Sequence, residues 1–65
     1  MIIKLNKEIY PVKAVRKAVH FYRKIAAFKL KEEGGYLLVS GKPEKEDEEL
    51  VRDEFLNFVL GIIRQ

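Results

Sequence analysis

The chain contains no cysteine, a single histidine, His20, and a single serine, Ser40. Without cysteine no disulfide can form, and one histidine cannot assemble a zinc site from the usual nitrogen and sulfur ligands. Ser40 has no partner base at a recognisable spacing, and His20 is better explained as a polar residue on a helix surface than as a general base. These absences predict a protein that is not an enzyme and that binds no cofactor or metal.

Long apolar runs are also missing, since the longest are about four residues, against the roughly 20 that cross a bilayer. Lys4 follows Met1-Ile2-Ile3 at once, a start unlike that of a signal peptide. We therefore expect a soluble, cytoplasmic protein that does not associate with membranes. Charged residues, rich in Lys and Glu, make up 35% of the chain, a composition typical of proteins from hot environments.

The first half of the chain shows a short alternating pattern followed by a helical one. Ile3 and Leu5 alternate with Lys4, which predicts a strand over residues 2–9. Pro11 suits the first turn of a helix, which we expect over residues 11–26. The apolar stripe of this helix consists of Val12, Val15, Val19, Tyr22 and Ile25, widened by Ala14, Ala18 and Phe21.

The second half predicts a hairpin and another helix. Phe28 and Leu30 alternate with lysines in a second strand over residues 28–31, and Gly34-Gly35 supply the positive φ angles of a tight turn. The third strand, residues 36–39, is continuously apolar and is therefore expected at the centre of the sheet. Acidic residues open a last helix over residues 46–63, where they favour the positive end of the helix dipole.

Together these elements predict one small α+β domain spanning residues 1–65, in the order β-α-β-β-α. A right-handed crossover followed by a hairpin gives a three-stranded antiparallel sheet of order 1-3-2, with two helices on one face. This is a truncated ferredoxin-like arrangement without its last strand. The first strand would then have a free edge, which is a candidate docking site.

Charge is divided sharply along the chain. Residues 1–31 hold nine Lys or Arg and one acid, whereas residues 32–65 hold four Lys or Arg and nine acids. One face of the first helix is basic and consists of Lys13, Arg16, Lys17, His20 and Lys24. Such a face could bind nucleic-acid phosphates or an acidic peptide. The plainer interpretation is a solvated helix face, paired in part with the acidic start of the last helix.

Aromatic residues decide between the two kinds of partner. The aromatic side chains Phe21, Tyr22, Phe28 and Tyr36 all fall on or near core positions of the predicted elements. Nucleic-acid surfaces combine positive charge with exposed aromatic rings on which bases stack. Nucleic acid is therefore the less favoured partner.

The last helix is more apolar than one sheet face requires. Its core stripe consists of Val51, Phe55, Phe58, Val59 and Ile62, and a second row consists of Leu56, Leu60 and Ile63. The second row either packs against the first helix or forms a binding or homodimer surface. Both explanations are open from the sequence.

Two stretches carry a family resemblance. The first runs from Leu5 to Pro11 into a helix with Ala14-Val15 and Lys17-Ala18, and the second is Glu54-Phe55-Leu56-Asn57 followed by Val59-Leu60. Together they resemble the small HxsD proteins of the His-Xaa-Ser peptide-maturation system, which includes radical-SAM enzymes. The resemblance implies an accessory protein that binds a precursor peptide or a modifying enzyme and carries no cofactor.

Two functional hypotheses follow. The first is a non-enzymatic, accessory protein-binding module that uses the sheet edge or the apolar surplus at Leu56, Leu60 and Ile63. The alternative is a small nucleic-acid-binding protein that uses the basic face of the first helix.

Overall fold

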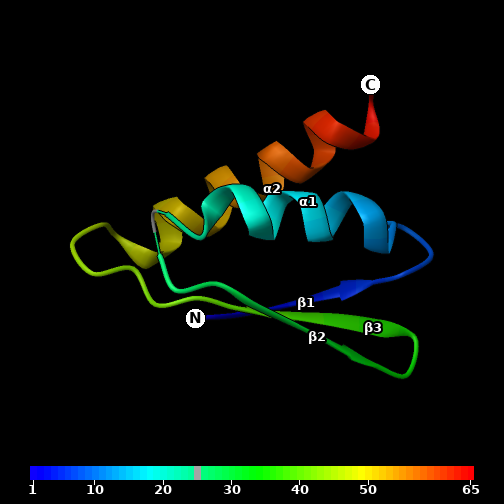
Figure 1. The fold of residues 1–65 in the computed structure, drawn as a ribbon, viewed down its shortest axis with the longest axis horizontal. Coiled ribbons are helices and arrows are strands. Elements are labelled where there is room, and N and C mark those ends of the chain that lie inside the picture. The colour runs from blue at the N-terminus through cyan, green and yellow to red at the C-terminus, as the bar shows by residue number, and fades with distance from the viewer. Residues whose placement is uncertain (25) are drawn as a thin grey trace.

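The computed structural model, which describes residues 1–24 and 26–65, contains three strands and two helices in those residues (Figure 1). In chain order they are β1 (Ile2–Asn6), α1 (Val12–Tyr22), β2 (Lys29–Glu33), β3 (Tyr36–Ser40) and α2 (Glu48–Ile63). The sheet is antiparallel with the order β1-β3-β2, and both helices lie on one side of it. The predicted α+β architecture, β-α-β-β-α order and 1-3-2 sheet are therefore confirmed.

The first strand and the first helix, β1 and α1, are both shorter than predicted. β1 ends at Asn6 because the Asn6 carbonyl accepts hydrogen bonds from the amides of Ile9 and Tyr10, at 3.1 and 2.8 Å, and its side chain accepts one from Glu8. This is the local turn chemistry of asparagine. α1 ends at Tyr22 rather than at residue 26, and Ala26 already pairs with Pro43 beside the sheet. Ile25 lies outside the described residues.

The hairpin and the start of α2 also differ from the prediction. β2 extends to Glu33 because Glu33 pairs with Tyr36 across the two-residue turn, in which Gly34 alone has a positive φ, of 60°. A glycine at the first central position is typical of a type II′ turn. α2 begins two residues late because the carboxylate of Asp47 caps it, accepting hydrogen bonds from the amides of Glu49 and Leu50.

The core lies between the inner face of the sheet and the two helices. The buried side chains are Ile3, Leu5, Ala14, Val15, Ala18, Val19, Tyr22, Ala26, Phe28, Leu37, Val39, Val51, Phe55 and Val59. Its aromatic centre is Phe55, whose ring stacks on Phe28 at 5.0 Å and meets the edge of Tyr22 at 5.5 Å. Burial, and secondarily the nearby Glu54 carboxylate, raises the pKa of Tyr22.

Two aromatic residues expected near the core are exposed. Phe21 is 59% exposed and stacks on the half-buried Phe58 at 4.7 Å, and Tyr36 is 41% exposed. Phe21 lies at the margin of the α1 stripe, where α2 covers only one side of its ring. Tyr36 is on the outer face of the sheet because only Leu37 and Val39 of β3 point toward the helices. The continuous apolar run of β3 therefore buries one face only.

Candidate partner-binding groove

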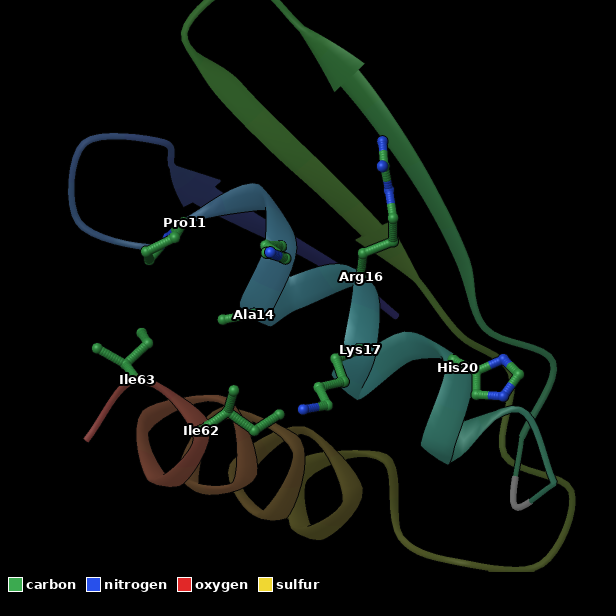
Figure 2. A pocket seen from close by; sticks show the side chains of 8 residues that line it. Pro11, Ala14, Arg16, Lys17, His20, Ile62 and Ile63 are labelled. Carbon is green, nitrogen blue, oxygen red and sulfur yellow. The ribbon is translucent and has the colours of Figure 1, made fainter. Parts of the chain in front are cut away.

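An open groove runs between the first half of α1 and the last turn of α2 (Figure 2). It has a volume of about 750 Å³ and is lined by Pro11, Lys13, Ala14, Arg16, Lys17, His20, Ile62 and Ile63. The two helices run antiparallel, so the amino-terminal end of α1 lies beside the carboxyl-terminal end of α2 (Figure 1). The predicted basic face of α1 and one residue of the predicted apolar surplus, Ile63, therefore meet here.

The rim of the groove is cationic. Lys13 and Lys17 are one helical turn apart on the exposed side of α1, opposite the buried Val15. Neither lysine has an ion-pair partner among the described residues, and no acidic residue lines the groove. Figure 2 shows Lys17 extending toward Ile62. The rim therefore presents uncompensated positive charge beside apolar side chains.

The other members of the predicted basic face lie differently. The Arg16 guanidinium is 3.5 Å from the Glu32 carboxylate of β2, and Figure 2 shows its side chain directed toward the strands. His20 is exposed at the far end of the groove. Lys24 follows the end of α1 and does not line the groove. The structure thus concentrates the positive charge of the groove at Lys13 and Lys17.

The apolar wall consists of the half-buried Ile62 and of Ile63, which is 38% exposed. Ala14 contributes a small side chain to the floor, so the surface dips between the helices. Spacing predicts core positions for Ile62 and Ala14 and a helix start for Pro11, and it marks none of the three as a binding residue. Their role depends on where the two helix ends meet, which helical spacing does not encode.

Leu56 and Leu60 do not line this groove. Phe58 faces α1, where it stacks on Phe21. Each residue turns an α-helix by about 100°, so positions two before and two after Phe58 lie on the opposite flank of α2. Leu56 packs against the core from that flank, while Leu60 is half-buried without being part of that packing. Of the three predicted partner residues, only Ile63 reaches the groove.

The basic face of α1 is not neutralised by the acidic start of α2. Because the helices are antiparallel, the first turn of α2 lies at the opposite end of the helical layer from Lys13 (Figure 1). Glu48 instead contacts the backbone nitrogen of Met1 at 2.8 Å. Within the described residues no ion pair joins α1 to α2. The ion pairs between the basic face and the start of α2, which the plainer interpretation expects, are therefore absent from the described residues.

The edge of β1 is a second candidate surface. Met1 and Gly41 exchange two backbone hydrogen bonds, and the amide of Lys7 donates to the carbonyl of Gly35. Because backbone bonding alternates along an antiparallel pair, the odd-numbered residues from 1 to 7 bond to the β3 side. The main-chain groups of Ile2 and Lys4 consequently point to the other edge, which pairs with no strand in the described part of the chain. The Lys4 ammonium lies 4.3 Å from the ring of Tyr36 on the outer face, and an edge lysine disfavours indiscriminate strand pairing.

Other kinds of site find no support in the part of the chain that the structure describes. It holds no group of three or more His, Cys, Asp or Glu side chains placed to bind a metal ion. No described helix combines the length and apolarity needed to span a membrane. Comparisons of the chain with models of known protein families, with curated proteins and with solved structures find no match.

Proposed function

We propose that this chain is a non-enzymatic protein-binding module whose groove between α1 and α2 accepts an acidic, amphipathic segment of a partner. The observation that carries the proposal is the combination of an apolar wall, Ile62 and Ile63, with the unpaired rim cations Lys13 and Lys17. An amphipathic helix places its apolar residues in a groove of this kind, and its acidic residues then face the cationic rim.

Each part of the groove has a separate role in this mode of binding. Apolar contact with Ile62 and Ile63 supplies affinity at about 25 cal/mol per Å² of surface removed from water. The lysines select against basic segments and accelerate association with acidic ones. The resemblance to HxsD proteins suggests the biological partner, a precursor peptide or an enzyme that modifies it.

The test is a titration of the chain into a fluorescently labelled synthetic helix of Glu, Leu and Ala with leucines at helical spacing. Fluorescence anisotropy should show saturable binding at low ionic strength. In the variant Lys13→Glu/Lys17→Glu, affinity should fall by about 10- to 100-fold because like charges then face each other at the rim.

A matched control makes the same change of charge on the other side of the molecule. Lys29 and Lys31 are exposed on the outer face of β2, so Lys29→Glu/Lys31→Glu alters the net charge equally without touching the groove. This variant should bind the helix within about threefold of the unmodified chain, because distant exposed charges are screened by salt. Equal losses in both variants, or no binding by the unmodified chain, would contradict the proposal.

A second candidate function, nucleic-acid binding, is supported by the exposure of Phe21. Its ring lies one turn beyond Lys17 on α1 and is 59% exposed, so the basic face has an aromatic neighbour after all. Phe21 could stack one base while the lysines contact phosphates, as in single-strand binding.

This function predicts that a labelled single-stranded oligouridine binds at low ionic strength and dissociates steeply as salt rises. Phe21→Ala should weaken binding by about 5- to 100-fold, the usual range for one stacked base. Anisotropy measures both effects. An oligouridine that shows no change in anisotropy at low salt excludes this function.

A further inference from the structure

We infer that a second copy of this chain occupies the groove, through an acidic patch at the start of α2. The inference rests on the proposed function, since it names one partner for the same groove. The acidic patch is centred on Leu50, which is 56% exposed although it is a leucine in a small domain. Its members are Leu50, Asp53 and Glu54, with Glu46 and Glu49 beside them.

The spacing of these residues explains the patch. Asp53 and Glu54 follow Leu50 by three and four positions, so all three share one face of α2. Leu50 lies well away from the inward direction, which is set by the buried side chains of Val51 and Phe55. Asp53 and Glu54 make no ion pair with any described residue. The patch therefore presents one apolar side chain with unpaired negative charge around it.

The groove complements this patch both in its apolar side chains and in its charge. Its apolar wall consists of the half-buried Ile62 and the exposed Ile63, and its unpaired rim charges, Lys13 and Lys17, are positive. Leu50 of one copy would enter the apolar part of the groove of another, and Asp53 and Glu54 would face the two lysines. The chain thus carries its own acidic, amphipathic segment.

The positions of the two surfaces allow a closed dimer. The groove is built at the last turn of α2, whereas Leu50, the centre of the patch, lies in the first turn of that helix, in a molecule whose longest extent is 32 Å (Figure 1). They cannot meet within one copy. Two copies related by a two-fold axis, with their helical layers facing and antiparallel, place each patch over the groove of the other. Both contacts then form at once, which closes the assembly and prevents head-to-tail growth.

The other route to a dimer, pairing of β1 with β1, is disfavoured by the charge of Lys4. The main-chain groups free to bond belong to Ile2 and Lys4, with the amide of Asn6. A two-fold pairing that uses all of them sets Lys4 directly opposite Lys4 of the other copy. Like charges directly opposite in a sheet are destabilising. Self-association should therefore run through the helices.

Sedimentation equilibrium with two charge-reversed variants tests this inference. The unmodified chain should dimerise at low ionic strength, and the dimer should weaken as salt rises. The variants Lys13→Glu/Lys17→Glu and Asp53→Lys/Glu54→Lys should each dimerise at least about tenfold more weakly, because each sets like charges against each other. An equimolar mixture of the two should recover a heterodimer, since both contacts in it again join opposite charges.

A substitution that leaves the net charge unchanged, together with the synthetic helix, completes the test. Leu50→Ser should weaken the dimer without altering net charge, and circular dichroism should show that it folds, because Leu50 is exposed. A chain that stays monomeric at low salt, or a mixture that does not recover a heterodimer, would overturn the inference. If the synthetic acidic helix still binds the monomer, the groove is functional and only the second copy is excluded. If neither binds, the proposed function fails as well.

Discussion

Phe55→Ala should remove a large fraction of the free energy of unfolding of the chain. Phe55 is 0% exposed, stacks on Phe28 at 5.0 Å and contacts the edge of Tyr22. Removing a buried phenylalanine ring costs about 3–5 kcal/mol, because the transfer energy is lost and a cavity remains. The free energy of unfolding expected for a domain of this length is only about 3–10 kcal/mol. Urea denaturation followed by circular dichroism measures the loss.

Phe21→Ala is the matched control, since it removes the same ring from an exposed position of α1. Phe21 is 59% exposed and contacts Phe58 by one face, so we expect a loss of about 1 kcal/mol or less. The unfolding midpoints of the two variants should therefore differ widely. Similar midpoints would mean that the core is not centred on Phe55.

Leu56→Lys and Leu60→Lys should differ in stability although they lie one turn apart on the same flank of α2. Leu56 packs against the buried core, and a lysine there must either desolvate its ammonium or withdraw from the contact. We expect Leu56→Lys to lower the free energy of unfolding by about 1–2 kcal/mol, against less than about 0.5 kcal/mol for Leu60→Lys.

Thermal unfolding of the two lysine variants measures this difference, with the charge change held equal between them. Both should bind the synthetic acidic helix as the unmodified chain does, because neither side chain lines the groove. Equal destabilisation would place Leu60 in the core as well. Loss of binding in a folded Leu60→Lys variant would show that the partner contacts the flank of α2 that carries Leu56 and Leu60.

The fold was predictable because local signals agree with its tertiary arrangement. Alternation at Ile3 and Leu5, the paired glycines and the helical stripes were enough to order the elements and the sheet. The boundaries were less accurate, because side-chain hydrogen bonds decide them. Asn6 ends β1 and Asp47 begins α2 through contacts that hydrophobic periodicity does not register.

The candidate site was predictable in its charge but not in its shape. Spacing alone placed Lys13 and Lys17 on an exposed face, and the structure agrees. The groove also needs Ile62 and Ala14, which look like ordinary core residues in the sequence. Ala14 is buried and Ile62 is half-buried, and both line the groove only because α2 meets α1 at its end. Phe21 was misjudged for a related reason, since helical spacing marks the apolar side of a helix but not how far the neighbouring helix covers it.

Chemical-shift mapping of the ¹⁵N-labelled chain with the synthetic acidic helix tests the central claim most directly, because it locates the contact without any substitution. We predict that the amide signals of Lys13, Lys17 and Ile63 shift on titration while those of β2 and β3 stay in place. Shifts confined to Ile2, Lys4 and Tyr36, on the edge and outer face of the sheet, would contradict the assignment of partner binding to the groove.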